Sequence, residues 1–313
     1  RSTQAKTLFP YTTLFRSGIP VSQLSADETE ILKNLEPQLT SRIIGQDESI
    51  NTMVKFIQRA KLGLKNPNRP LASFLALGPS GVGKTETAKS IAEILFGSST
   101  NLIRIDMSEF SEANTVPRLI GSPPGYIGYE AGGDLTNKVM SEPHTLILLD
   151  EIEKAHPKIF DIFLQLLDDG RLTSGKGELV DFTQTIVMAT SNISAEQIVE
   201  NYDRDQNLNS EKNFSELLMP ELKKHFRTEF INRFDSVLIF NPLSDEALLE
   251  IAILEAKKIE ARAQKHGIVF EIDHDLLITA IKNINDRSLG ARPIKRYVEN
   301  LCEGLIAQAV LQE

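Results

Sequence analysis

The stretch 74–86, Phe-Leu-Ala-Leu-Gly-Pro-Ser-Gly-Val-Gly-Lys-Thr-Glu, constrains the fold of this chain more than any other. A short apolar run, typical of a buried strand, ends at Gly78, and a helical pattern begins at Glu86. Between them lies the complete phosphate-loop pattern, two glycines separated by four residues and followed by Lys84 and Thr85. A glycine-rich turn before a helix would explain the glycines but not the Lys-Thr pair. The pattern therefore predicts a nucleotide site.

The chemistry of this loop follows from its residue types. Glycines let successive backbone N–H groups face phosphate oxygens, and the following helix adds its positive N-terminal end. Lys84 would reach the β- and γ-phosphates, and the Thr85 hydroxyl would hold Mg²⁺, so we expect ATP and Mg²⁺ as cofactors. The cofactor-binding residues expected here are Gly78, Pro79, Ser80, Gly81, Val82, Gly83, Lys84, Thr85 and Glu86.

Two carboxylates, Asp150 and Glu151, follow the apolar run 146–149. Ligands of open α/β sheets bind at the carboxyl ends of the strands. Asp150, with Thr85, would hold Mg²⁺ and its water shell, and Glu151 would orient and polarise the attacking water. A solvated acidic turn is the alternative, which the phosphate loop upstream disfavours. Asn192 ends the next such run and could bond the γ-phosphate or the water, although asparagine often only caps a helix.

Short apolar runs alternate with helical or turn-rich sequence before residue 243, which predicts a parallel sheet covered on both faces and so an α/β fold. The five predicted strands are the one before the phosphate loop, 102–105, 146–149, 185–189 and 237–240. The sequence after Pro242 is mainly helical around one alternating run, 268–272. Because one strand cannot form a sheet and a helical pattern continues to Glu313, we expect an incomplete small helical domain.

The predicted organisation has three parts. Residues 1–17 contain a run that resembles the translation of a sequencing adapter, so we expect a non-native segment there. Residues 18–242 would form the large nucleotide-binding domain, and residues 243–313 the small helical domain. Within the large domain, the polar stretch 196–214 is expected to be a surface loop.

Composition narrows the classes of partner. The formal net charge of −9 argues against nucleic acid, because binding to phosphate backbones needs a basic surface. The single cysteine, Cys302, excludes internal disulfides and fits a reducing compartment, so we expect a cytoplasmic protein. No apolar run approaches the roughly 18 residues of a membrane span, and the five histidines lack metal-ligand spacing. We expect neither a membrane nor a nucleic-acid partner.

Several motifs together are specific enough to indicate a family. They are the phosphate loop, Ile44-Gly-Gln-Asp-Glu48, Arg104-Ile-Asp-Met-Ser-Glu109, Leu119-Ile-Gly-Ser-Pro-Pro-Gly-Tyr-Ile-Gly-Tyr-Glu130, Asp150-Glu-Ile-Glu-Lys-Ala-His-Pro157 and Leu167-Asp-Asp-Gly-Arg-Leu-Thr173. In this combination residues 18–313 resemble the second AAA+ module of the Clp unfoldases, the ClpB and ClpC type.

The resemblance implies roles that the residues alone leave open. It makes Asn192 the first sensor, Arg292 the second sensor, and Arg233 an arginine finger that reaches the nucleotide of a neighbouring subunit. It also implies nucleotide contacts at Ile43 and Ile44 and a homo-hexameric ring. Without the resemblance, a lone arginine is usually a surface ion pair of small energetic value.

The resemblance also implies a loop that contacts substrate. The family carries the aromatic residue of Gly-Tyr-Ile-Gly, here Tyr126 followed by Ile127, in the central pore. Flanking glycines allow the loop to move, and an aromatic ring can grip an extended polypeptide of any sequence. The alternative is a turn whose ring packs onto the core. Residues 171–182 would form a second pore-facing loop.

The expected function is therefore an ATPase module that hydrolyses Mg·ATP and threads unfolded or tagged proteins through a pore, as a chaperone or as the regulatory ATPase of a Clp protease. An alternative is an ATP-binding assembly module without productive turnover. Another is an AAA+ remodeller of DNA or transcription complexes, which the acidic charge and the Gly-Tyr-Ile-Gly loop disfavour. The stretch 196–214 lacks the Ile/Val-Gly-Phe/Leu tripeptide of protease-docking relatives, so docking to a ClpP-like peptidase is neither implied nor excluded.

Overall fold

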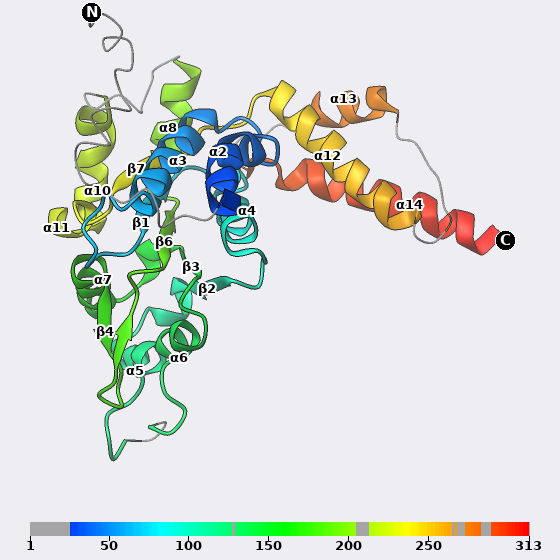
Figure 1. The fold of residues 1–313 in the computed structure, drawn as a ribbon. Helices are drawn as coiled ribbons and strands as arrows, with labels where there is room; N and C mark the ends of the chain where they lie inside the picture. Colours follow the sequence, from blue (N-terminus) through cyan, green and yellow to red (C-terminus); the bar gives the residue numbers. More distant parts are fainter. Residues whose placement is uncertain are drawn as a thin grey trace, which may run out of the picture.

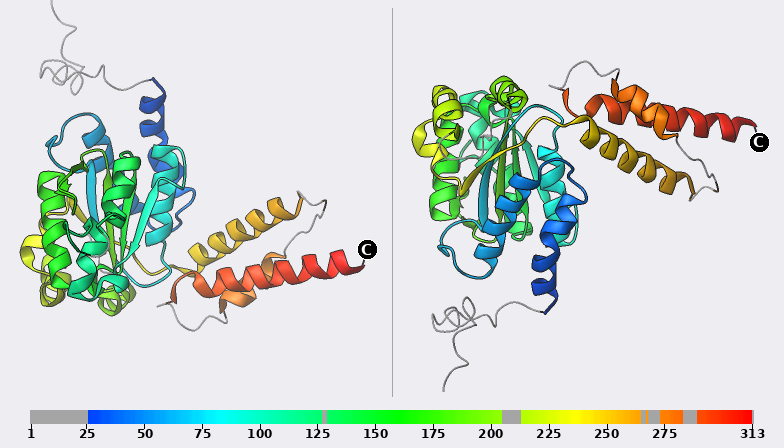
Figure 2. Two further views of the ribbon diagram at one scale, coloured as in Figure 1. Left: turned by 90° about the horizontal axis from the view of Figure 1, so that it is seen from below. Right: turned by 90° about the horizontal axis from the view of Figure 1, so that it is seen from above.

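The computed structural model describes residues 26–126, 129–204, 213–264, 267, 273–282 and 289–312. They form an α/β body from which a group of helices extends to one side (Figures 1 and 2). The predicted non-native segment 1–17, the predicted strand 268–272 and Ile127 lie outside the described residues.

The body is built on one parallel sheet with the strand order β2-β3-β6-β1-β7. Its strands are β1 Ala72–Leu77, β2 Leu102–Asp106, β3 Leu146–Asp150, β6 Ile186–Ser191 and β7 Ser236–Ile239. This confirms the predicted five-stranded parallel sheet. The register aligns Leu77 with Ser191 and Asp106 with Asp150, so the carboxyl ends of the strands form one edge. The phosphate loop and the two predicted carboxylates, Asp150 for Mg²⁺ and Glu151 for the attacking water, lie at this edge.

Alternation along each strand divides the core into two layers. Phe74 and Ala76 of β1 join the core on one face, while Leu75 and Leu77 join the core on the other. The first face is covered by α2 Ala26–Thr40, α3 Asp47–Lys61 and α4 Lys84–Phe96. The second is covered by α5 Val116–Ile120, α6 Asp134–Ser141, α7 Pro157–Asp169, α8 Ala195–Asp203, α10 Met219–His225 and α11 Thr228–Ile231. Because both faces are covered, β1 and β6 are buried along their whole length.

The sequence-based prediction of a loop at 196–214 is wrong at its start. α8 continues to Asp203, because Ile198 is fully buried in the second core and gives this polar stretch one anchored side. Residues 205–212 lie outside the described part of the chain. The segment after them is helical again, with a π-helical turn at Phe214–Leu218 that leads into α10.

The extending helices are α12 Asp245–Gln264, α13 His274–Lys282 and α14 Arg292–Gln312. They join the same core as α2, α3 and α4, through residues such as Leu248, Ile294 and Cys302. The helices thus confirm the predicted small helical part, which lies on the α2–α4 side of the sheet. No helix in the described ranges is both long enough and apolar enough to cross a membrane.

A hairpin of β4 Arg171–Thr173 and β5 Leu179–Asp181 lies beside the loop that carries Tyr126. Gly175 of its turn donates to Ile120 O at 2.8 Å, and Lys176 Nζ donates to Glu130 O at 3.1 Å. A Cβ atom on Gly175 would lie 2.4 Å from the carbonyl carbon of Gly121. The two loops that the family resemblance assigned to a pore are therefore packed against each other at their bases.

Candidate functional site

The phosphate loop turns tightly between β1 and α4. Gly78, Gly81 and Gly83 have φ values of 150°, 74° and 112°, in the region that glycine adopts most easily. A Cβ atom would lie 2.3 Å from Phe240 O at Gly78 and 2.4 Å from Leu289 O at Gly81. The loop therefore needs glycine for its conformation and for the close approach of neighbouring backbone.

Lys84, the first residue of α4, folds back over this loop and is only 8% exposed. Its Nζ donates to Gly78 O, to Pro79 O at 3.0 Å and to Asn192 Oδ1 at 2.9 Å. Burial lowers the pKa of Lys84 from 10.5 to about 8, although nearby carboxylates, Glu153 foremost, oppose that shift. The structure thus brings the predicted lysine and the predicted first sensor into direct contact.

Asp150 and Glu151 lie beside Thr190 of the neighbouring strand. Asp150 Oδ1 accepts from Thr190 Oγ1 at 2.6 Å, and Asp150 Oδ2 accepts from Arg104 at 2.6 Å. Glu151 has φ 54° and ψ 51°, a left-handed conformation rare for a non-glycine residue, and its N–H donates to Thr190 Oγ1 at 3.3 Å. Its carboxylate makes no hydrogen bond or ion pair with the described residues. Strain of this kind clusters at functional sites, and Glu151 is one of the residues that line the cleft.

These groups line one cleft together with residues from the phosphate loop, β2 and the start of α14. Its lining residues are Ser80, Gly81, Gly83, Lys84, Thr85, Glu86, Arg104, Asp106, Asp150, Glu151, Thr190, Asn192, Ala291, Arg292 and Lys295. Arg292 reaches it because Ala291 N donates to Gly81 O at 3.0 Å, which ties the extending helices to the phosphate loop. Eight of the loop and sensor positions predicted from the sequence therefore meet the two predicted carboxylates in this cleft.

A second pocket adjoins the first at Gly81, Gly83 and Glu86. Ile43 and Ile44 line it, and so do Ile251 and Leu254 of α12. Its aliphatic lining makes this pocket more apolar than the first cleft. It is therefore suited to the flat ring of a nucleotide whose phosphates would lie in the first cleft. The two isoleucines that the family resemblance assigned to the nucleotide lie there.

The donor set of the cleft fits Mg²⁺ bound through a nucleotide. Thr85 and Asp150 supply hydroxyl and carboxylate oxygens, which Mg²⁺ prefers. Within the described ranges no group of three or more acidic, histidine or cysteine side chains is placed to hold a metal by itself. Mg²⁺ usually keeps several waters and binds through one or two carboxylates plus phosphates, which is what this set allows.

Sequence reasoning missed Arg104, Glu153 and the part played by Thr190. Glu153 Oε1 accepts from Asn192 N at 3.1 Å, while its Oε2 is buried without a hydrogen-bond partner among the described residues. Arg104 and Thr190 lie on the two strands that flank β3. Both residues lie near the ends of predicted strands, which is the only sequence feature that points to them. Their contact with Asp150 can be recognised only once the strand order places β3 between β2 and β6.

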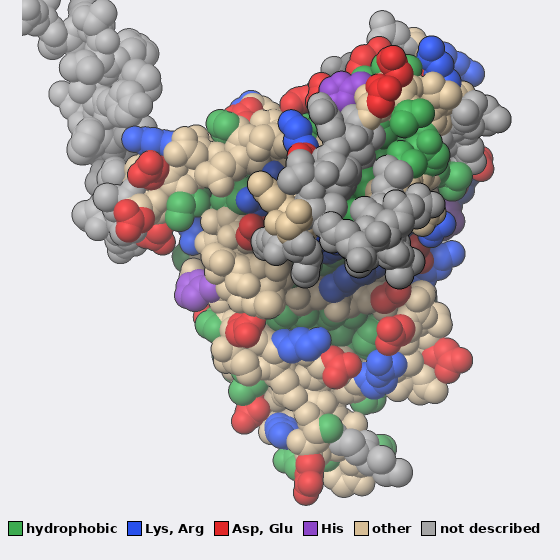
Figure 3. Space-filling view, turned by 90° about the vertical axis from the view of Figure 1, so that its right-hand side faces the viewer, with side chains coloured by type: hydrophobic (Ala, Val, Ile, Leu, Met, Phe, Trp, Pro, Cys, Tyr) green, Lys and Arg blue, Asp and Glu red, His purple; other side chains and the backbone are tan. Residues whose placement is uncertain are grey.

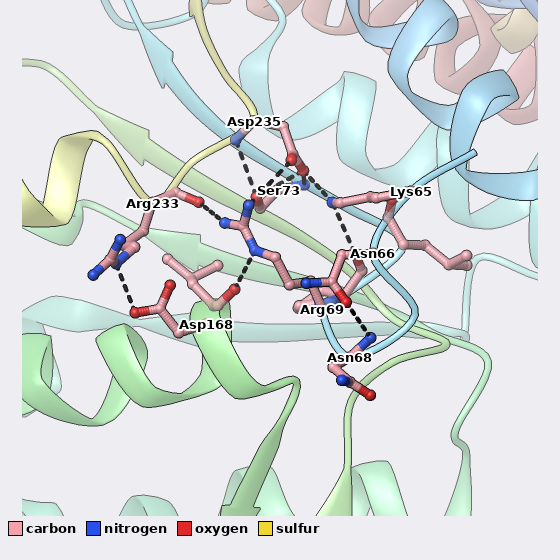
Figure 4. A network of polar contacts seen from close by, with 11 residues as sticks. Lys65, Asn66, Asn68, Arg69, Ser73, Asp168, Arg233 and Asp235 are labelled. Carbon is pink, nitrogen blue, oxygen red and sulfur yellow. Dashed lines mark hydrogen bonds and ion pairs between the residues drawn. The ribbon is translucent and has the colours of Figure 1, made fainter. Parts of the chain in front are cut away.

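The structure does not bring Arg233 to this cleft. Arg233 lies between α11 and β7, and the next residues pair with the amino end of β1 through Asp235 N and Ser73 O, 2.9 Å apart. A strand of six residues spans roughly 20 Å, so Arg233 lies at the opposite end of the sheet from Lys84. Its Nε forms an ion pair with Asp168 Oδ2 at 2.6 Å without the direction of a hydrogen bond (Figure 4).

Tyr126 lies on the loop between α5 and α6, and 70% of its surface is exposed. This exposure disfavours the alternative in which the ring packs onto the core. Leu179 of the neighbouring hairpin is also 64% exposed. On the face of the molecule shown in Figure 3, acidic and basic side chains are interspersed rather than gathered into one basic surface.

Comparison with known proteins adds a family to this geometry. Residues 69–237 match the model of the AAA domain (Cdc48 subfamily), and residues 243–313 match that of the C-terminal, D2-small domain of ClpB protein. The chain is 43% identical to the chaperone protein ClpB of Lactococcus lactis over 295 residues, which is 94% of this chain and 34% of that protein. It is also 43% identical over 300 residues to the negative regulator of genetic competence ClpC/MecB of Bacillus subtilis, 95% of this chain and 37% of that protein.

A solved structure has a fold similar to that of this chain. The fold is similar to a cryo-electron-microscopy reconstruction of Hsp104 in a closed state with ATPγS and FITC-casein. The TM-score is 0.83 at 38% sequence identity, and the match covers 96% of this chain and 52% of that one. The chain thus spans about a third of the length of the ClpB and ClpC relatives and about half of the Hsp104 chain.

Proposed function

The chain belongs to the AAA+ family as a second AAA+ module of the ClpB/ClpC type, and from that premise we propose that it hydrolyses Mg·ATP to pull on polypeptide chains. One observation carries the proposal: Lys84, Asn192, Asp150 and Glu151 converge at the carboxyl edge of a single sheet. The large domain 18–242 would hold the site, and the small domain 243–313 would cover it.

In this proposal each residue of the cleft has one task. The Lys84 ammonium exchanges its carbonyl partners for phosphate oxygens, and Thr85 and Asp150 hold Mg²⁺ and its waters. Mg²⁺ held there would supply positive charge that offsets the negative charge of the phosphates. The carboxylate of Glu151, which has no hydrogen bond or ion pair with the described residues, orients the attacking water and takes up its proton. Asn192, fixed by Glu153 and Lys84, senses the γ-phosphate.

We propose a homo-hexameric ring because the cleft of one subunit lacks a group that the same subunit displays elsewhere. Arg233 lies at the far end of the sheet, where it cannot serve its own nucleotide. In a ring, Arg233 of one subunit would complete the cleft of the next, while Arg292 acts on the nucleotide of its own subunit. Threading would then use the exposed Tyr126 together with Ile127 and the hairpin beside them. Casein in the Hsp104 reconstruction supports a polypeptide as the substrate class.

The first test is the steady-state ATPase rate per subunit against protein concentration. We expect the rate to rise cooperatively, because each cleft needs a neighbour, and to fall to background at every concentration in Arg233→Ala. A rate per subunit that is independent of concentration would contradict the ring. ATP binding without turnover at any concentration would instead favour the assembly-module alternative.

The pulling step has its own test in Tyr126→Ala. Because Tyr126 lies outside the cleft, we expect the basal ATPase rate to change less than about two-fold, while unfolding of a tagged fluorescent protein is lost. Tyr129→Ala, three residues further along the same loop, is the matched control for loss of an aromatic ring. Unfolding that persists in Tyr126→Ala would remove the gripping role.

A further inference from the structure

The guanidinium of Arg69 connects two separate elements next to Arg233 (Figure 4). Its Nε donates to Leu167 O at 2.8 Å, near the end of α7. One of its terminal nitrogens donates to the carbonyl of Arg233 itself. The residue after Leu167 is Asp168, the ion-pair partner of Arg233. One side chain thus holds the backbone on both sides of the Asp168–Arg233 pair.

Asp235 anchors the same turn to the start of β1. Its carboxylate is 8% exposed and accepts from Lys65 Nζ at 2.5 Å, from Ser73 N at 2.7 Å and from Ser73 Oγ at 2.8 Å. The second terminal nitrogen of Arg69 lies 3.9 Å from it. Asp235 N also donates to Ser73 O at 2.9 Å, so the backbone from Arg233 to Asp235 is tied to the sheet through Ser73 and to Arg69 through the Arg233 carbonyl.

Aromatic packing supports the turn independently of Arg69. Phe230 and Phe234 flank Arg233, with ring centroids 5.2 Å apart, and Phe230 also lies 4.9 Å from Phe160 of α7. These rings hold α11 and the turn on α7 even without the guanidinium. Loss of Arg69 should therefore shift the turn rather than unfold it.

The Asp168–Arg233 pair itself is easily opened. The side chains are 36% and 38% exposed, and a surface ion pair of this kind contributes little to stability. The Arg233 side chain can therefore leave Asp168 at small cost. Its backbone position, in contrast, has no such freedom, and a displacement of about 1 Å in a catalytic group can lower a rate by roughly 100-fold.

We infer that Arg69 is a positioning residue for Arg233. Its guanidinium donates to the carbonyls of both Leu167 and Arg233, and so fixes the backbone position from which the Arg233 side chain reaches a neighbouring subunit. The inference rests on the proposed role of Arg233 across the subunit interface. Arginine suits the task because its planar fork can donate to two carbonyls at once, whereas lysine carries one compact ammonium. A purely structural role, the capping of α7 by a cation, is the competing explanation.

A two-component mixture separates the two explanations. The acceptor subunit carries Arg233→Ala, and the donor subunit carries Glu151→Gln, so turnover in the mixture comes from acceptor clefts completed by donor arginines. Arg69→Ala is then placed either in the donor or, as the matched control, in the acceptor, which has no Arg233 side chain left to position. Phosphate release is measured against ATP concentration, and thermal unfolding of each variant is recorded.

We expect Arg69→Ala in the donor to lower the kcat of the mixture on the order of ten-fold with little change in KM, and in the acceptor to change it less than two-fold. Arg69→Lys in the donor should restore only part of the rate. Equal effects in both placements, or no effect in the donor, would overturn the inference while leaving the role of Arg233 intact. A mixture without turnover would overturn that role and the inference with it. If Arg69→Ala does not fold, Arg69→Gln, which keeps donors for one carbonyl, replaces it.

Discussion

The two ends of the central sheet treat polar groups in opposite ways. At the carboxyl end, Glu151 has a strained backbone, and its carboxylate and one carboxylate oxygen of Glu153 lack a hydrogen-bond partner among the described residues. At the amino end, Asp235 is buried but has a partner for each oxygen. Groups left short of partners can take up a ligand, whereas saturated groups hold a shape. In the proposed function, the carboxyl end carries out the chemistry and the amino end presents Arg233 to a neighbouring subunit.

The largest effect should come from the carboxyl end of the sheet, called the unsaturated end here because polar groups at it lack partners; the amino end is the saturated end. Replacement of Glu151 by glutamine keeps the size of the side chain but removes the base, so we expect hydrolysis to fall by about 10²–10⁴-fold while ATP remains bound. Single-turnover hydrolysis and nucleotide retention on a filter measure the two quantities. Glu142→Gln, an exposed residue after α6, is the matched control and should behave as wild type. Turnover above a tenth of the wild-type rate in Glu151→Gln would break the assignment of chemistry to this end.

The saturated end should respond in stability instead. Asp235→Asn leaves Lys65 largely buried without its counter-charge, so we expect the free energy of unfolding to fall by roughly 2–3 kcal/mol, about 30–150-fold in the folding equilibrium. The affinity of the cleft for ATP, measured below the unfolding transition, should not change. Denaturant unfolding and nucleotide binding on the same sample check both statements. An affinity that falls in parallel with stability would show that the two ends are not separate.

Most of the unsaturated end could be predicted from the sequence because its signals are local. The Gly78 to Thr85 pattern, the apolar runs and the acidic pair at the end of β3 each lie within about eight residues of chain. A parallel sheet then brings all strand ends to one edge by topology alone. The predicted strands consequently match the observed ones within one or two residues, and the predicted carboxylates line the cleft.

The saturated end could not be predicted because its contacts join distant parts of the chain. Arg69 and Arg233 are 164 residues apart, and Lys65 and Asp235 are 170 apart. No short pattern marks such pairs, and an isolated arginine carries little information. Thr190 was missed for a related reason: its hydroxyl gains a role only when strand order places it beside Asp150. Helix α8 shows that polar composition alone does not predict a loop, since one buried isoleucine, Ile198, is enough to anchor a helix there.

The smallest predicted effect concerns the charge of Lys84. It is a dependence of ATP affinity on pH, which we expect at the carboxyl end of the sheet. Burial lowers the pKa of Lys84 to about 8, whereas phosphate oxygens favour its charged form and so raise its pKa in the complex. Above pH 8, ATP binding must therefore take up a proton, and the Kd for ATP should rise about ten-fold between pH 7 and pH 9.

This pH dependence can be measured by calorimetry in the Glu151→Gln background, in buffers of different ionisation enthalpy that report the proton directly. Lys84→Arg is the matched control, because a guanidinium keeps its charge throughout this range; it should bind more weakly but without the pH dependence. If the wild-type Kd were flat to pH 9, Lys84 would be charged in the free protein despite its burial. The carboxylates around Lys84 would then already stabilise its charged form, which is the effect proposed for the phosphates. The polar groups of the cleft would in that case be better partnered than the hydrogen bonds alone indicate.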